Sequence, residues 1–383
     1  MPSSDLDFRE TVRWLAATPV LAHADVVAKA RLLLLDTMAC AVAGLGEEEP
    51  GALAGLRAMT APGGAAWPGS AAMAAADAAF VGAVAACWHE ACEGLARAHG
   101  RPGLHAVPVA YALGRARNAT LGEVLAAIVW GYEIGGRAGE AMRIRAGLHV
   151  DGTWGLFASV AAAARMIGLE EDRALPALAM AACQIPTSLY EPVAQGRTAR
   201  NTYAGHAALM AIPLVEAAAA GITAPDTAFV LAAQALAGRA DQSSWPWAPP
   251  GEFLILQGYL KPFAAVRHVH YGAACAIARH AAHAETRDVR ALHLRTYPEA
   301  LTYCGNRSPT TAIQAQFSLT HGLAFALRTG NLGPEAYAAD VLGDAPAVRS
   351  KAVAYMAPSL GRASAEQITD AVLTGPLDAP LAC

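Results

Sequence analysis

The chain has 383 residues, of which 55% are hydrophobic and 16% are charged, and its formal net charge is −4 at pH 7. This acidic balance, without a long run of basic residues, excludes the electrostatic footprint of a nucleic-acid-binding protein. The most apolar windows, 76–88 and 207–221, are rich in alanine and are interrupted by Asp77, Pro213 and Glu216. Neither window supplies the roughly 20 strongly apolar residues that a membrane span needs.

The amino-terminal sequence and the cysteines indicate the compartment. The first residues, MPSSDLDFRETV, have neither the basic region nor the apolar region of a secretory signal. The seven cysteines are an odd number and show no C-x-x-C spacing, which argues against a disulfide framework and against a structural zinc site. The sequence therefore predicts a cytoplasmic protein that binds no metal ion.

The first two thirds of the chain have the pattern of successive helices. Thr120 and Glu123 stand in the register of a capping box, and Thr223 is a candidate cap before a proline. Gly238 is a candidate helix end. The first of the expected helices is apolar almost all round, which is typical of a buried helix that ends at a glycine. The expected helices span 24–46, 120–142, 168–184 and 223–239.

The amino-acid composition of the sequence changes at about Gln242. The stretch 241–253 is rich in proline and tryptophan and is expected to be a loop between two domains. Beyond it, 289–298 alternates apolar and polar residues well enough for a strand, and 312–330 returns to a helical pattern. The predicted fold is mainly α: a large all-helical domain with a smaller α/β (α+β) domain. The expected domains are 1–245 and 246–345, with 346–383 as a C-terminal segment that could return to the helical domain.

Polar residues that could take part in catalysis or binding lie in five segments. None of these segments is a nucleophile elbow, a phosphate-binding glycine loop or a zinc signature. The segments share a bias toward histidine, arginine and lysine in a chain that is acidic overall. Such a bias is expected where a site holds an anionic substrate that carries carboxylates. The segments are 89–105, 147–155, 196–208, 260–274 and 302–311.

In order and spacing these segments resemble the MmgE/PrpD family, which includes 2-methylcitrate dehydratase, cis-aconitate decarboxylase and an iminodisuccinate epimerase. The resemblance covers about residues 25 to 345. It rests on the stretches LLLLDTMACAVAG, GRPGLHAVPVAYAL, GYEIGGR, GLHVDGTWGLFASVAAAARMIGLEEDRALPALAMA, RNTYAGHAALMAIPLVEAAAAGIT, LKPFAAVRHVHYGA and NRSPTTAIQAQFSL.

The resemblance implies a fold and a kind of chemistry. It implies a helical large domain, a small α/β lid, a homodimer, and a site that needs neither a metal nor an organic cofactor. In this family a proton α to a carboxylate is removed. A β-group or a carboxylate then leaves, or the proton returns on the other face. The first step needs a base near the C–H bond and cations over the carboxylate, where negative charge builds.

Matching positions assign roles by the same resemblance. His149 becomes the first choice for general base or acid, because an imidazole works near neutral pH. Lys261 becomes a proton donor whose pKa would be lowered by burial beside cations. Without the resemblance, a core histidine and a surface lysine are the alternatives. Arg267 and His270 match a carboxylate binder and a site wall, and His268 is expected to be structural.

Two positions depart from the family pattern. Most relatives have a histidine where this chain has Arg101, and many have a catalytic lysine where it has Arg200. A guanidinium keeps its proton but binds a carboxylate through two hydrogen bonds. Both arginines are therefore expected to bind carboxylate groups of the substrate and not to act as acids. His99 is then expected to take the place of the histidine that is absent at position 101. Glu93 is either a base or an acid at a helix end in solvent.

A last match lies at Tyr303, where the family has a tyrosine, followed by Asn306 and Arg307 in a turn whose register could slip by one. The preferred function is a cofactor-independent lyase that eliminates a group from a di- or tricarboxylate, as a dehydratase does. The arginine substitutions favour a second hypothesis, an isomerase or epimerase of an iminodisuccinate-like substrate. Two more hypotheses are a catalytically silent relative that binds a polycarboxylate or a partner chain, and a packed helical scaffold without a site.

Overall fold

A computed structural model describes residues 8–238, 247–282 and 294–338. Contacts divide the chain into two compact units, each of which is treated separately below. The first unit comprises Met1–Trp88, Cys92–Glu191 and Ala199–Leu260. The second comprises His89–Ala91, Pro192–Thr198 and Lys261–Cys383. Two short stretches of the second unit are therefore inserted into the sequence of the first.

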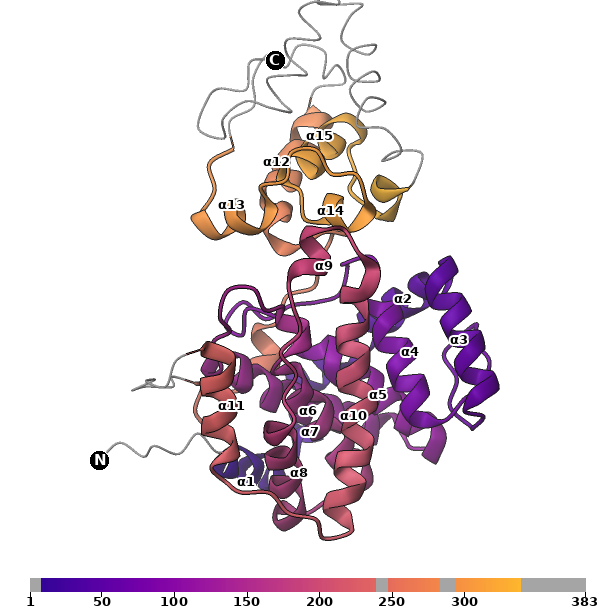
Figure 1. Ribbon diagram of the computed structural model, residues 1–383, viewed down its shortest axis with the longest axis vertical. Coiled ribbons are helices and arrows are strands. Elements are labelled where there is room, and N and C mark those ends of the chain that lie inside the picture. Colours follow the sequence, from indigo (N-terminus) through magenta and orange to yellow (C-terminus); the bar gives the residue numbers. More distant parts are fainter. Residues whose placement is uncertain (1–7, 239–246, 283–293, 339–383) are drawn as a thin grey trace, which may run out of the picture. The chain divides into compact units, whose positions relative to one another are not determined.

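The first unit is built from α-helices joined by turns and short 3₁₀ segments, as Figure 1 shows. Its α-helices are α1 (Arg9–Ala17), α2 (Ala24–Leu45), α3 (Glu48–Thr60), α4 (Ala75–Cys87), α5 (Pro102–Arg117), α6 (Leu121–Ala141), α7 (Gly155–Ile167), α8 (Glu171–Cys183), α10 (Thr202–Ala219) and α11 (Ala228–Ala237). The short helix α9 (Glu191–Ala194) begins at the last residue before the second insertion. The 3₁₀ segments are η1 (Val20–Ala22), η2 (Val150–Gly152), η3 (Thr198–Asn201) and η4 (Leu254–Gln257).

Small residues let the central helices of this unit approach closely. Helix α6 is buried along almost its whole length and packs most extensively on α7. A Cβ atom placed on Gly131 would lie 2.7 Å from the carbonyl oxygen of Ala158 and 2.6 Å from the Cβ of Ala106. The high alanine content noted in the sequence thus serves tight helix packing, because larger side chains would push these backbones apart.

This close contact predicts a loss of stability in Gly131→Ala. The added methyl group has no room against the backbone of α7, and overpacking of this kind costs about 1–3 kcal/mol. Gly55→Ala in α3 is the matched control, because a Cβ there meets nothing within 4 Å. There the helix propensity of alanine should add stability, by roughly 0.5–1 kcal/mol. Urea unfolding of both variants tests this, and equal shifts in the same direction would contradict it.

The capping box is confirmed at the start of α6. The hydroxyl of Thr120 accepts the backbone N–H of Glu123 at 3.2 Å, and the Glu123 carboxylate accepts the N–H of Thr120 at 2.7 Å. The end of α11 at Gly238, with φ of 70°, is confirmed as well. The expected cap at Thr223 is wrong, since α11 begins only at Ala228. The backbone N–H of Ala228 instead bonds to the carbonyl of Pro225 at 3.0 Å and closes a turn.

The expected helix 24–46 is present as α2, but its full burial is wrong. Leu32, Leu35 and Val42 are exposed at 48%, 65% and 43%. They share one side of α2, while Leu33, Thr37 and Ala41 are buried. An apolar residue on every side therefore does not decide which side of a helix packs against the core. None of the helices in the described ranges has both the length and the apolar character that crossing a bilayer requires.

The described part of the second unit is helical too. It contains α12 (Arg267–Ala282), α13 (Pro298–Cys304), α14 (Ala312–Gln316), α15 (Leu319–Thr329) and η6 (Pro334–Tyr337), and α12 packs on α15. Its only β-type pairing among the described residues is an isolated bridge between Gly305 and Ser318, so the expected α/β (α+β) character of this domain is wrong there.

The expected strand 289–298 falls partly outside the described residues, which resume at Leu294, and α13 begins at Pro298. A short alternation of three apolar residues cannot specify a strand by itself, because a strand needs partner strands to be stable. The segment 346–383 and residues 241–246 of the expected loop also lie outside the described residues.

Candidate active site

The candidate site of the first unit begins at the amino terminus of α5. Glu93 is fully buried, and its Oε1 accepts the backbone N–H groups of Gly103 at 2.7 Å and Leu104 at 3.2 Å. These N–H groups lie in the first turn, where a helix has no internal acceptors for them. Glu93 is therefore not an acid in solvent. The Glu93 carboxyl holds the first turn of α5 in place and thereby positions Arg101, which is the N-cap residue of this helix.

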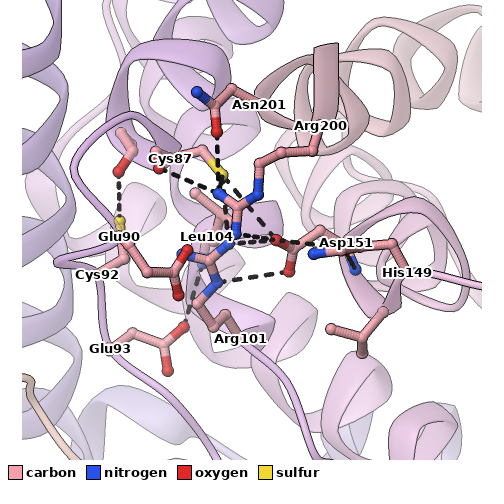
Figure 2. A network of polar contacts seen from close by, with 12 residues as sticks. Cys87, Glu90, Cys92, Glu93, Arg101, Leu104, His149, Asp151, Arg200 and Asn201 are labelled. Atoms are coloured by element: carbon pink, nitrogen blue, oxygen red, sulfur yellow. Dashed lines mark hydrogen bonds and ion pairs between the residues drawn. The ribbon is translucent and has the colours of Figure 1, made fainter. Parts of the chain in front are cut away.

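Two arginines surround one carboxylate in the centre of this site (Figure 2). Arg101 forms an ion pair with Asp151 through Nη2, and its Nε lies 3.4 Å from the other carboxylate oxygen, Oδ1. Arg200 lies on the other side, with Nη2 3.8 Å from Oδ2 of Asp151. All three side chains are buried. The two arginines that were expected to bind a substrate carboxylate thus bind a carboxylate of the protein itself.

A thiol and an amide also contact the two arginines. The Sγ atom of Cys87, at the end of α4, receives N–H groups from Arg101 Nη2 at 3.2 Å and Arg200 Nη1 at 3.0 Å. Arg200 Nη1 also donates to the side-chain oxygen of Asn201 at 2.9 Å. These contacts fix the planes of both guanidinium groups, so the cluster is rigid before any ligand arrives.

His149 lies beside the carboxylate of Asp151. Its Nδ1 accepts the backbone N–H of Asp151 at 3.2 Å and lies 3.8 Å from the Oδ2 atom. The ring stacks on Tyr190, with centroids 5.9 Å apart, and meets Tyr203 edge-on at 5.8 Å. A neutral imidazole has one N–H group, and Nδ1 is occupied as an acceptor here. The proton of neutral His149 therefore resides on Nε2, which makes this nitrogen a donor.

Burial shifts the pKa of two groups of the first unit, Glu93 and His105. Burial raises the pKa of Glu93 to about 7, and the nearby Asp36 carboxylate adds to the shift, while the N–H bonds from Leu104 and Gly103 oppose it. Burial lowers the pKa of His105 to about 4. Near neutral pH, His105 is therefore uncharged and Glu93 exchanges its proton readily.

The pKa of Glu93 predicts how stability depends on pH. Between about 4.5 and 7 the unfolded chain ionises this carboxyl while the folded protein keeps the proton, so stability falls as pH rises. Glu93→Gln removes this loss, which is on the order of 3 kcal/mol, and its amide oxygen can still accept both N–H bonds. Urea unfolding at pH 5 and pH 8 should show that the free energy of unfolding of the variant, relative to that of the wild type, is higher at pH 8 than at pH 5. A constant difference between the two proteins would contradict the assignment.

The second unit holds Lys261 and His270. Nζ of Lys261 donates to the Glu90 carboxylate at 2.7 Å and to its backbone carbonyl at 2.8 Å, and both side chains are buried. The expectation of cations beside Lys261 is corrected here, because the group next to it is a carboxylate. Glu90 has a φ of 53°, which is uncommon for a residue other than glycine. His270 bonds through Nε2 to the carbonyl of Ala265 at 2.9 Å, and burial lowers its pKa to about 4.

Other expected residues of the second unit form a separate group around α13. His268 bonds through Nδ1 to the hydroxyl of Tyr297, and its ring lies parallel to that of Tyr303 at 6.3 Å. This agrees with the structural role expected for His268. Asn306 is exposed, and its side-chain oxygen accepts the N–H of Ser308 at 3.0 Å. The remaining expected residues of the chain are Arg267 and Arg307, which are partly buried, and His99 of the first unit, which is exposed.

Comparison with family models identifies the chain. The MmgE/PrpD N-terminal domain matches residues 9–240, and the MmgE/PrpD C-terminal domain matches residues 263–373. The chain belongs to the MmgE/PrpD family. Members of this family are generally enzymes of the dehydratase and lyase type. No curated protein matches this MmgE/PrpD chain.

The structure of this MmgE/PrpD protein also shows residues that the sequence did not single out. Asp151 and Cys87 belong to the arginine cluster, and Glu90 pairs with Lys261. A signal existed for Asp151, because it is the only acid in the stretch 147–155 that contains His149. Within the described ranges, no group of three or more histidine, cysteine, aspartate or glutamate side chains could hold a metal ion.

Proposed function

We propose that this MmgE/PrpD protein is a cofactor-independent lyase that removes a proton α to a carboxylate of a di- or tricarboxylate and then expels a β-group, as a dehydratase does. The observation that supports this most is the pair of buried arginines, Arg101 and Arg200, around a carboxylate. When an α-proton leaves, negative charge spreads onto the substrate carboxylate. Fixed cations stabilise that charge most where water is excluded.

Arg200 is the better candidate for the substrate carboxylate. Arg101 is already engaged with both oxygens of Asp151, whereas Arg200 approaches only one of them, at 3.8 Å. A guanidinium has five N–H donors, so Arg200 can bind a second carboxylate beside Asp151 by exchanging one of its contacts with Cys87 or Asn201. Arg101 then serves to hold Asp151, and Arg200 binds the substrate.

We assign His149 the role of proton donor. The backbone N–H of Asp151 occupies its Nδ1, so its Nε2 begins the reaction with a proton. A leaving hydroxyl needs a proton as its bond to carbon breaks, and general acids of this kind contribute about 10²–10⁴-fold to a rate. Lys261 remains the proposed residue for the other proton transfer, on the basis of its family position. It can accept the α-proton once its ammonium group has passed a proton to the Glu90 carboxylate, which lies 2.7 Å away. The proposal includes the homodimer and the cytoplasmic location that the sequence suggested.

Lys261→Met is expected to lower the turnover rate by about 10²–10⁴-fold, because a positioned acid or base is lost. Lys29→Met is a matched control. Lys29 is also partly buried and donates to a backbone carbonyl, that of Gly258, at 2.6 Å, but it matches no site position. Steady-state kinetics of the two variants, with melting curves to confirm folding, provide the measurement. Similar rates for Lys261→Met and Lys29→Met would remove Lys261 from the mechanism.

Product analysis tests the reaction class. The protein is incubated with 2-hydroxy di- and tricarboxylic acids, and the products are followed by NMR. Elimination gives an alkene and water, whereas epimerisation of an acid that has two stereocentres gives only the other diastereomer. The alternative isomerase is supported by Arg200, since a guanidinium where relatives have a lysine cannot protonate a leaving group. An alkene supports the lyase and a diastereomer the isomerase, while unchanged acids throughout the panel would favour a silent binding relative.

A further inference from the structure

We propose that Cys40 and Cys92 form a reversible disulfide when hydrogen peroxide oxidises the protein. Cys40 lies on α2, Cys92 lies between α4 and α5, and both are free thiols in the structure. A single reversible pair differs from the disulfide framework that the odd number of cysteines argues against, since disulfides in reducing compartments are usually transient. The proposal does not depend on which reaction the protein catalyses.

One face of α2 lies against the chain that contains Cys92. Asp36, Cys40 and Gly44 are four residues apart on this helix, so they share a face. Oδ2 of Asp36 accepts the backbone N–H of Glu93 at 3.0 Å. One turn after Cys40, a Cβ atom on Gly44 would clash with the carbonyl of Ala85, so the backbones of α2 and α4 touch there. Cys40 therefore lies between two contacts that hold α2 in place.

The side chains of the two cysteines meet in this position. Cys40 and Cys92 are hydrogen-bonded to each other through their thiols. The Sγ atom of Cys92 also donates to the carbonyl of Ala86 at 2.7 Å, which fixes the direction of its side chain (Figure 2). The sulfur atoms of a disulfide are about 2 Å apart. Thiols in a hydrogen bond reach this distance by a small movement of their side chains.

The two thiols differ in access to solvent. Cys40 is partly exposed, whereas Cys92 is fully buried. The hydrogen bond with Cys40, together with burial, raises the pKa of Cys92, so its thiol keeps the proton. Because peroxide needs an accessible thiol that can ionise, Cys40 is expected to react first and Cys92 second.

The oxidation proceeds in two steps. The Cys40 sulfur attacks one oxygen of hydrogen peroxide, the O–O bond breaks, and Cys40 becomes a sulfenic acid as water leaves. The Cys92 sulfur then attacks the Cys40 sulfur, the S–O bond breaks, and the hydroxide leaves as a second water with the Cys92 proton. One peroxide is reduced and two thiols are oxidised to a disulfide. A dithiol such as dithiothreitol restores both thiols by exchange.

The bond would fasten α2 to the residue directly before Glu93. The Glu93 carboxyl holds the first turn of α5 through the N–H groups of Gly103 and Leu104, so oxidation acts next to the start of this helix. The cross-link also restricts the unfolded chain, and the oxidised protein is therefore expected to unfold at a higher urea concentration than the reduced protein.

The test is peptide mapping of the full chain after treatment with hydrogen peroxide and alkylation of the remaining thiols. Trypsin cuts after lysine and arginine, so it places Cys40 in the peptide 32–57 and Cys92 in the peptide 58–97. The wild type is expected to give these two peptides linked to each other. Dithiothreitol should separate them.

Cys92→Ser should abolish the link, and this variant is needed because 58–97 also contains Cys87. Cys183→Ser is the matched control, since it removes an exposed cysteine at the end of α8 and should keep the link. If Cys92→Ser does not fold, fragmentation of the linked wild-type peptides identifies the bonded cysteine.

The absence of linked peptides from the wild type would overturn the proposal. A link that persists in Cys92→Ser would also overturn it, because the bond then belongs to Cys87. So would a linked wild type that unfolds at the same or a lower urea concentration than the reduced protein, because such a bond forms only where native packing is disrupted.

Discussion

Replacing Arg137 with leucine is expected to destabilise the protein by about 3–5 kcal/mol, the usual effect of breaking a buried ion pair. Arg137 lies on α6 with no exposed side-chain surface and bonds to the Glu133 carboxylate at 2.6 Å. It also donates to the backbone carbonyls of Ala248, Pro249 and Glu252 at 2.8–3.0 Å. The substitution leaves a buried carboxylate and three carbonyl groups without these donors.

Glu133 shows why the loss should be large. Its carboxylate accepts the N–H groups of Leu254 at 3.0 Å and Ile255 at 2.9 Å, so the ion pair fastens residues 248–255 to α6. The matched control is Arg13→Ala, which removes an exposed ion pair with Glu171 at 2.8 Å and should cost about 1 kcal/mol or less. The double variant Glu133→Gln, Arg137→Leu should recover part of the loss. Urea unfolding decides, and equal losses for Arg137→Leu and Arg13→Ala would contradict the account.

Replacing His149 with alanine is expected to slow product formation by about 10²–10⁴-fold, while exchange of the α-proton with solvent continues. The reason is the bond from the backbone N–H of Asp151 to Nδ1, which makes Nε2 a donor and assigns His149 to the second proton transfer. The two rates are measured together by following product and deuterium in the same sample.

The control for His149→Ala is His23→Ala. His23 is exposed and its ring packs on Phe253 at 5.1 Å, so its removal should leave both rates near those of the wild type. If His149→Ala loses exchange and product formation to the same degree, His149 removes the α-proton and the assignment to the donor role is wrong. Melting curves confirm that each variant is folded.

Local features of the fold were predictable where neighbours in sequence determine them. Thr120 and Glu123 satisfy each other's backbone groups within one turn, and Gly238 adopts the left-handed conformation that ends α11. The expected cap at Thr223 failed because the turn that closes at Ala228 competes with it. The expected α+β domain failed because alternation over a few residues does not provide partner strands.

Recognition of the family predicted candidate site residues, but not how they pair. Arg101 and Arg200 were expected to hold a carboxylate of the substrate, whereas the carboxylate that lies between them belongs to the protein. That this carboxylate belongs to Asp151 depends on a contact between residues 50 positions apart, which no local pattern encodes. The same holds for Lys261 and Glu90, which are 171 positions apart. Long-range charge pairing sets the balance of a buried cluster, and only the folded structure reveals it.

The most direct test of the proposed chemistry is deuterium incorporation at the α-carbon of candidate carboxylic acids in deuterated water, for the wild type and for Arg200→Lys. Removal of an α-proton over a bound carboxylate predicts incorporation by the wild type. It also predicts a raised KM in Arg200→Lys, since a lysine keeps the charge but not the two-point contact. The absence of deuterium from every acid of the panel, or an unaltered KM in Arg200→Lys, would contradict the account.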